Sequence, residues 1–242
     1  MEIPEKVSNL LPEKLRSILR GSPSAGEARF PSQSSPTLRG NGPRLSERES
    51  VAARQSRGLE QFFGHIHGKA GLRILDLAGL NQENVNLITN LGHKLFSVDF
   101  TRSLAESFTE PDLSDQSSPG RIESFLAQTL NYPEESMDGA LVWDALEYMS
   151  PALLSATIDR LFHVLRPQSC LLAFFHSDDK VREVPYYGFR LHDLGTLLVS
   201  QRGVRRPVQT FNNRSLERLF AKFESVKFFL TRENLRELIV KR

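Results

Sequence analysis

From about residue 58 to the C-terminus, short apolar runs alternate with segments whose apolar residues recur at helical spacing. Strands that are apolar along their whole length are typical of a sheet buried on both faces, and helices between them give parallel crossovers. We therefore expect an α/β fold with a doubly wound, mostly parallel sheet. The expected strands are 73–77, 94–98, 122–127, 138–143, 169–175, 226–231 and 235–240, of which the last two form an antiparallel pair. The clearest helix covers 151–165, because Pro151 opens it and Pro167 follows its end.

Residues 1–57 are predicted to form a disordered basic tail ahead of a domain at 58–242. The tail holds ten basic and six acidic residues, a net charge of +4, whereas the whole chain carries +2. Residues 4–20 show an amphipathic helical stripe, which fits either a helix that docks on a protein partner or a membrane surface, or a transient helix. Residues 21–50 are rich in Ser, Pro, Gly and Arg and are expected to be a linker.

Composition excludes several classes of protein. Cys170 is the single cysteine, so no intramolecular disulfide or cysteine metal cluster can form, and its apolar neighbours predict a buried small side chain. No apolar stretch approaches the ~20 residues that span a bilayer, and no signal-peptide core is evident, so a cytoplasmic protein is expected. The small net charge gives no strong nucleic-acid signal. His65 and His67 have no third ligand nearby and are expected to be loop histidines, not a metal site.

Polar and small residues follow the expected strands, at the edge where a parallel sheet binds its ligands. The first strand leads into Asp76-Leu77-Ala78-Gly79-Leu80-Asn81-Gln82, and the second follows Gly92-His93 and ends in Val98-Asp99-Phe100. The later segments are 128–133, 137–148 and Leu161-Phe162-His163-Val164-Leu165-Arg166-Pro167. In order and spacing, these segments resemble the class I S-adenosylmethionine-dependent methyltransferases, and the type 11 methyltransferases among them. A G-x-G-x-x-G turn typical of dehydrogenases does not follow the first strand.

The resemblance implies a seven-stranded sheet and S-adenosylmethionine as cofactor. It implies that Asp99 accepts hydrogen bonds from both ribose hydroxyls, although a simple cap after the strand is the alternative. It also implies that Gln128 contacts the adenine amino group. Asp144 could orient the substrate or cap the next turn. The cofactor residues implied are Asp76, Ala78, Gly79, Leu80, Asp99, Phe100, Gln128, Thr129, Leu130, Trp143 and Asp144.

The first turn departs from the family pattern Gly-x-Gly-x-Gly. Its three glycine positions hold Ala78, Leu80 and Gln82. Glycine permits positive φ and close approach of the backbone to a ligand, so Leu80 is expected to add a steric cost of about 1 kcal/mol or more. Gly79 could relieve this cost if the turn is shifted by one residue.

The segment 177–211 is longer than a plain connection, and in this fold such insertions commonly cover the acceptor site. Its candidates for substrate contact are Tyr186, Tyr187, Arg190 and His192, whereas Arg205 and Arg206 fit solvated charges. Two functions stay open. One is a methyltransferase acting on an unidentified small-molecule or protein acceptor, and the other is a catalytically inactive relative kept as a binding or scaffolding module.

Overall fold

The computed structural model describes residues 51–108, 115–177, 182–231 and 235–242. The helix expected over 4–20 and the linker after it lie outside these residues and stay predictions. No helix in the described ranges is both long enough and apolar enough to cross a membrane.

The central sheet has the strand order β3-β2-β4-β5-β9-β8. Its parallel part consists of β3 (Lys94–Ser97), β2 (Arg73–Asp76), β4 (Met137–Trp143) and β5 (Leu165–His176). The C-terminal strand β9 (Leu235–Lys241) runs antiparallel between β5 and β8 (Ser225–Leu230). The expected α/β class, the mostly parallel sheet and the antiparallel C-terminal strand are therefore confirmed.

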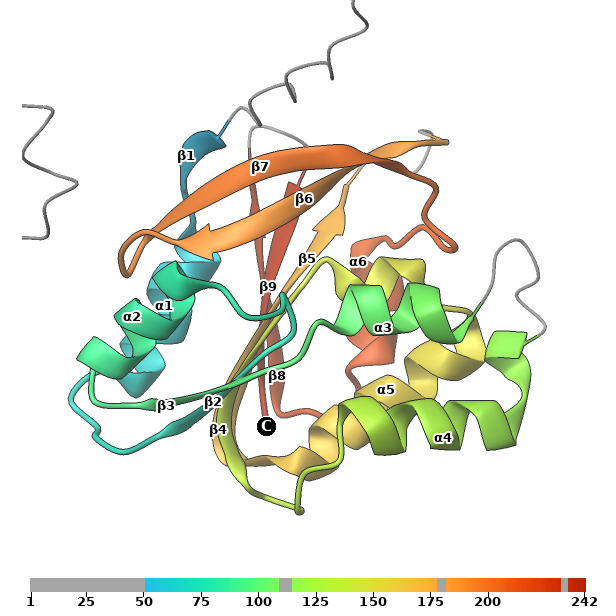
Figure 1. Ribbon diagram of the computed structural model, residues 1–242, viewed down its shortest axis with the longest axis horizontal. Coiled ribbons are helices and arrows are strands. Elements are labelled where there is room, and N and C mark those ends of the chain that lie inside the picture. The colour runs from blue at the N-terminus through green and yellow to red at the C-terminus, as the bar shows by residue number, and fades with distance from the viewer. Residues whose placement is uncertain (1–50, 109–114, 178–181, 232–234) are drawn as a thin grey trace, which may run out of the picture. The chain divides into compact units, whose positions relative to one another are not determined.

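Helices cover both faces of this sheet (Figure 1). One hydrophobic cluster receives side chains from α1 (Arg57–Ile66) and α2 (Gln82–Asn90), and the other from α3 (Phe100–Ser107), α4 (Pro119–Thr129), α5 (Pro151–Val164) and α6 (Asn213–Leu219). Successive side chains of a strand point to opposite faces. Accordingly, Leu171, Ala173 and Phe175 of β5 join the second cluster, while Cys170, Leu172 and Phe174 join the first. Cys170 is buried, as predicted.

The segment 122–127 corrects the predicted strand count. It lies inside α4, so the central sheet of the described residues has six strands, not seven. Pro119 stands in the first turn of α4, and the buried residues Ile122, Phe125 and Thr129 are spaced by three and four. That spacing places them on one face of a helix, where they pack on the core.

A second, antiparallel sheet consists of β1 (Val51–Gln55), β7 (Thr196–Arg205) and β6 (Val184–Leu191). β6 and β7 form a hairpin, called here the 184–205 hairpin, and β1 pairs along β7. Ser56 then caps α1 by accepting from Leu59 N at 3.0 Å, and Glu237 accepts from Gly58 N at 2.6 Å. Residues 51–57, assigned above to the tail, are thus part of the folded unit.

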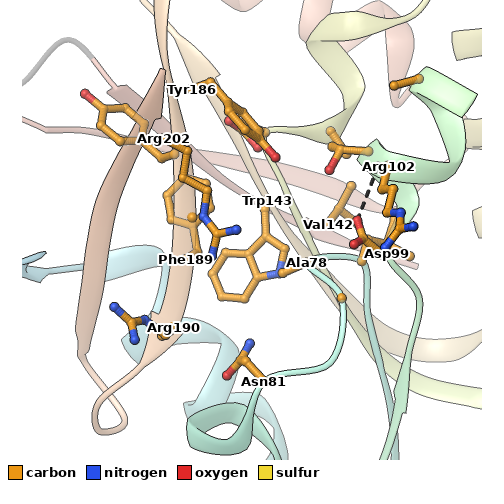
Figure 2. A pocket seen from close by; sticks show the side chains of 18 of the residues that line it. Ala78, Asn81, Asp99, Arg102, Val142, Trp143, Tyr186, Phe189, Arg190 and Arg202 are labelled. Carbon is orange, nitrogen blue, oxygen red and sulfur yellow. Dashed lines mark hydrogen bonds between the residues drawn. The ribbon is translucent and has the colours of Figure 1, made fainter. Parts of the chain in front are cut away.

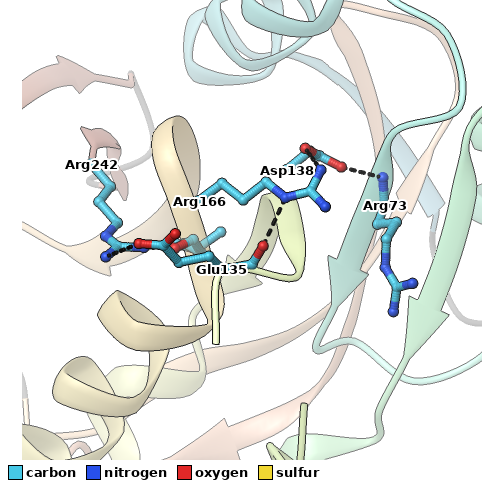
Figure 3. A network of polar contacts seen from close by, with 6 residues as sticks. Arg73, Glu135, Asp138, Arg166 and Arg242 are labelled. Carbon is cyan, nitrogen blue, oxygen red and sulfur yellow. Dashed lines mark hydrogen bonds and ion pairs between the residues drawn. The ribbon is translucent and has the colours of Figure 1, made fainter. Parts of the chain in front are cut away.

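The amino-terminal ends of the strands carry a network of ion pairs (Figure 3). Asp138 accepts from the backbone N–H of Arg73 at 2.9 Å and pairs with Arg166 at 2.7 Å. Glu135 pairs with Arg242 at 3.1 Å, and its carbonyl accepts from Arg166 Nε at 2.7 Å. These contacts join β2, β4, β5 and the end of β9 at the edge opposite the candidate site.

Candidate functional site

A cavity of about 410 Å³ opens at the carboxyl ends of β2, β3 and β4, and the 184–205 hairpin forms its other wall (Figure 2). Its volume lies within the range of small-molecule sites. A parallel sheet places its ligand sites at this edge. The predicted residues that line it are Ala78, Gly79, Leu80, Asp99, Trp143, Asp144, Tyr186, Tyr187 and Arg190.

The turn after β2 has its positive φ at Gly79 (+83°), and Leu80 does not have a positive φ. Leu80 therefore does not carry the expected strain. Its side chain is 80% exposed, so it lines the cavity without filling it. Gly79 N donates to the Val98 carbonyl at 3.0 Å, and a backbone bridge joins Ala78 to Asp99. A Cβ at Gly79 would lie 3.2 Å from the Asp99 side chain. The shifted turn therefore holds the exposed Asp99 carboxylate against the backbone of Gly79.

Asp76 is fully buried and does not line the cavity. Its Oδ1 accepts from Trp143 Nε1 at 2.7 Å and from Ala78 N at 3.0 Å, and its Oδ2 accepts from Asn84 Nδ2 at 2.6 Å. Burial raises the pKa of Asp76 despite these three donors. Asn84 also accepts from Leu191 N of the hairpin at 2.7 Å. Asp76 thus joins the turn, the indole and the hairpin instead of facing a ligand.

Trp143 ends β4 with a φ of +58°, a region that side chains other than glycine adopt at a cost of about 1 kcal/mol. Its indole is stacked on Phe189 of the hairpin, with ring centroids 5.3 Å apart and 6° between planes. The hydrogen bond to Asp76 and this stacking offset the backbone cost. As a result, the indole forms the floor of the cavity (Figure 2).

Asp144 follows Trp143 and immediately precedes η3 (Ala145–Tyr148). Several titratable groups are buried together in this part of the structure. Burial, followed by the charge of Glu147, raises the pKa of Asp144 to about 7, and Tyr148 Oη donates to Asp144 Oδ2 at 3.3 Å. Glu147 accepts from the backbone N–H of His176 and contacts His176 Nδ1, both at 2.6 Å. Burial lowers the pKa of His176. The hydrogen bond and the charge of Glu147 together raise this pKa by more than burial lowers it, so the net shift is upward.

Sequence reasoning did not assign a role to Glu147 or His176. Each is a polar residue in an otherwise apolar segment, which was the available signal. Their contact joins residues 29 positions apart, from η3 and the end of β5, and only the folded chain shows it.

Besides Asp76, five predicted residues lie outside the cavity. Phe100 and Leu130 are fully buried in the core, and Thr129 donates its hydroxyl to the Phe125 carbonyl at 2.8 Å. Gln128 lines a separate hollow beside α4, because the segment before it is a helix and not a strand of the sheet. His192 is exposed in the turn between β6 and β7.

The hairpin supplies the remaining wall. Tyr186 and Tyr187 line the cavity with Arg190, which pairs with Glu83 at 3.2 Å. Arg205, expected to be solvated, instead lies 3.8 Å from the ring centroid of Tyr186 and 5.3 Å from that of Tyr148. Arg202 and Phe189 also line the cavity, although neither was predicted.

Within the described ranges, no group of three or more metal-ligating side chains occurs, and His65 contacts the Gln61 carbonyl at 2.8 Å.

No family model and no curated protein sequence matches the chain. Solved structures similar to it include 1,6-didemethyltoxoflavin-N1-methyltransferase of Burkholderia thailandensis with 1,6-didemethyltoxoflavin and S-adenosylhomocysteine bound, which is 15% identical over 76% of this chain and 74% of that one, with a TM-score of 0.41. A SAM-dependent methyltransferase from Archaeoglobus fulgidus is 15% identical over 76% and 91%, with a TM-score of 0.43. The glycopeptide N-methyltransferase MtfA, complexed with S-adenosylmethionine, is 10% identical over 77% and 94%, with a TM-score of 0.43. Because these identities and TM-scores are low, the ligands of this chain must be inferred from its own residues.

Proposed function

We propose that the chain is an S-adenosylmethionine-dependent methyltransferase whose cofactor site is centred on Asp99. The observation that carries the proposal is the exposed Asp99 carboxylate, held beside the Gly79 backbone in a cavity at the carboxyl edge of the sheet. Asp99 Oδ1 caps α3 by accepting from Arg102 N at 3.2 Å, which leaves Oδ2 and further lone pairs for ribose hydroxyls. The residues present therefore fit the nucleoside part of the cofactor.

The cofactor would supply a methyl group on a sulfonium and leave as S-adenosylhomocysteine. Asp144 lines the same cavity, and its pKa of about 7 suits a group that accepts a proton from an acceptor O–H or N–H. The Tyr148 hydroxyl holds that carboxylate in place. The hairpin, which forms the other wall of the cavity, would align the acceptor, and alignment is the main requirement of methyl transfer.

One observation favours the second candidate, a catalytically inactive binding module. All three hydrogen bonds accepted by Asp76 come from the protein, and the Trp143 indole, one of these donors, is stacked on Phe189 of the hairpin. The part of the site next to Asp76 is therefore closed by the chain's own side chains. A module of this kind could keep the Asp99 half of the cavity for a nucleoside without transferring a methyl group.

Calorimetric titration with S-adenosylmethionine and S-adenosylhomocysteine tests the proposal. We expect micromolar binding of at least one, about −8 kcal/mol. Asp99→Asn keeps the helix cap but loses charge and acceptor capacity, so we expect affinity to fall roughly tenfold to a hundredfold. Asp159→Asn, at an exposed carboxylate of α5, is the matched control and should bind as the native chain does.

Each outcome decides between the candidates. Binding together with transfer of labelled methyl groups to an acceptor supports the enzyme. Binding of the nucleoside with no transfer to any acceptor of a broad small-molecule and protein set supports the inactive module. The absence of binding up to millimolar ligand would remove the cofactor site altogether.

A further inference from the structure

Arg202 reaches the cavity because of an irregularity in the hairpin. The pairing of β6 and β7 shifts register between Tyr186, which faces Gly203, and Tyr187, which faces Gln201. Arg202 is the extra residue in this bulge. A β-bulge re-aims a side chain, and bulges are frequent beside functional sites. Here the bulge aims Arg202 at the cavity, and Figure 2 shows its guanidinium above Trp143.

Gly188, on the opposite strand, leaves the space that the Arg202 side chain occupies. A Cβ on Gly188 would lie 2.9 Å from both Cζ and Nη2 of Arg202. The guanidinium therefore crosses the hairpin at a place where any larger residue would displace it.

Arg205 is held at the same wall by aromatic rings. Its guanidinium lies over Tyr186 and near Tyr148, at the distances of cation–π contacts. It lines the cavity and also a second hollow of about 510 Å³, which shares Thr101 and Ala105 with the first and has Leu104 and Phe108 in its wall. Arg205 therefore stands where the two spaces adjoin.

The two arginines differ from the other two that line the cavity. Arg102 pairs with Glu106 at 2.8 Å, and Arg190 pairs with Glu83 at 3.2 Å. In the part of the chain that the structure describes, no carboxylate lies within ion-pair distance of Arg202 or Arg205. Of the carboxylates in the cavity, Asp99 caps α3, and Asp144 is buried beside Tyr148. The hairpin wall thus carries two positive charges without a described counterion.

We propose that Arg202 and Arg205 bind the carboxylate or phosphate group of a small anionic methyl acceptor. The planar guanidinium matches both anions with paired hydrogen bonds, which makes arginine the preferred partner for them. The apolar residues of the second hollow suit an aromatic or aliphatic body attached to that anion. This proposal rests on the proposed function, since it names the acceptor class of the same site.

Trp143 is the only tryptophan of the chain and lines the cavity, so its fluorescence reports binding there. The probes are phenyl phosphate and benzoate, with benzyl alcohol as the neutral match. We expect both anions to change the emission saturably and to bind about tenfold or more tightly than the alcohol, since charge-assisted hydrogen bonds are lost with the alcohol. Comparison of the two anions shows whether the site prefers phosphate or carboxylate.

Variants make the test specific. Arg202→Gln and Arg205→Gln should each weaken phenyl phosphate about tenfold. Gly188→Ala should weaken it too while keeping every charge, because it displaces the Arg202 guanidinium. Lys227→Gln, which removes an exposed charge of β8 and does not line the cavity, should have no effect. Equal weakening by Lys227→Gln, or anions that bind no better than benzyl alcohol, would overturn the proposal.

S-adenosylhomocysteine separates this proposal from the preceding one. The native chain and Arg202→Gln should bind it equally, because Arg202 and Asp99 come from opposite walls. Anion binding that depends on Arg202 in a chain that does not bind S-adenosylhomocysteine would leave an anion site but remove the methyltransferase. Binding of S-adenosylhomocysteine without any preference for anions would remove the acceptor class alone.

Discussion

Replacing Asp144 with asparagine should stabilise the fold above pH 7 and reduce the dependence of stability on pH. Burial, followed by the charge of Glu147, raises the pKa of Asp144 from 3.8 to about 7. Between these values the folded chain keeps a proton that the unfolded chain has released. Stability from this group is therefore fully present below about pH 4 and is lost as the pH rises through about 7. Asparagine cannot ionise, so the variant escapes this loss.

The size of the effect follows from the pKa shift. A rise of about three units corresponds to about 4 kcal/mol, an upper figure because Asp144 is coupled to Glu147 and His176. The amide oxygen of asparagine can still accept from the Tyr148 hydroxyl, so the native contact is kept. We therefore expect the variant and the native chain to be similar near pH 4 and to differ by as much as about 4 kcal/mol at pH 8.

Urea unfolding followed by Trp143 fluorescence, at intervals from pH 4 to 8.5, measures this difference. The raised pKa of His176 also makes stability fall as the pH rises, but it does so in both proteins, so the difference between them isolates Asp144 and its couplings. Asp159→Asn removes a carboxylate that pairs with Lys222 at the surface, and as the control it should not reproduce this difference. Parallel profiles for the native chain and Asp144→Asn would refute the assigned effect of burial.

Three further predictions concern stability, measured by calorimetry or urea unfolding. Asp76→Ala leaves three donors without an acceptor and should cost about 3 kcal/mol or more, whereas an unchanged midpoint would contradict the network. Gly79→Ala should cost about 1 kcal/mol because of the positive φ of Gly79 and the nearby Asp99 side chain. Leu80→Ala should change stability by no more than about 0.5 kcal/mol, because Leu80 is exposed. A larger cost for Leu80→Ala than for Gly79→Ala would show that the turn is strained at Leu80 and not at Gly79. Deletion of 1–50 should leave the thermal midpoint nearly unchanged, but deletion of 1–56 should lower it because β1 and the Ser56 cap are lost; a drop with the shorter deletion would show that the tail docks on the domain.

The sequence predicted the parallel strands because each contains adjacent apolar residues, which are typical of strands in a sheet covered on both faces. The prediction failed at 122–127, since a window of six residues with three large apolar groups fits a strand or a helix equally. It also missed β1, because four of its five residues are exposed and no apolar pattern marks an edge strand of this kind. The hairpin was anticipated only as an insertion, because the pairing of its strands is a long-range property.

The site was predictable to the extent that it follows from strand ends. Ala78, Gly79, Asp99, Trp143 and Asp144 stand at the carboxyl ends of strands or within three residues of them, and the topology brings them to one edge. What the sequence could not provide was the partner of each group. An acidic residue at the end of the first strand suggests contact with a ligand. The carboxylate of Asp76 instead accepts hydrogen bonds from an indole, an amide and a backbone N–H, which lie up to 67 positions away.

The two sides of the cavity carry groups of opposite charge, and this arrangement bears on both proposals. The sheet side presents the carboxylates of Asp99 and Asp144, and the hairpin side presents the guanidiniums of Arg202 and Arg205. A cationic ligand would be drawn to the carboxylates of the sheet side, and an anionic ligand to the guanidiniums of the hairpin side. Each bound ligand would then neutralise the charges that repel the other. Binding of one should then strengthen binding of the other, and the coupling must be reciprocal. A cation with no anionic partner would face two unpaired arginines, so a cofactor titrated alone should bind more weakly than in the presence of an anionic acceptor.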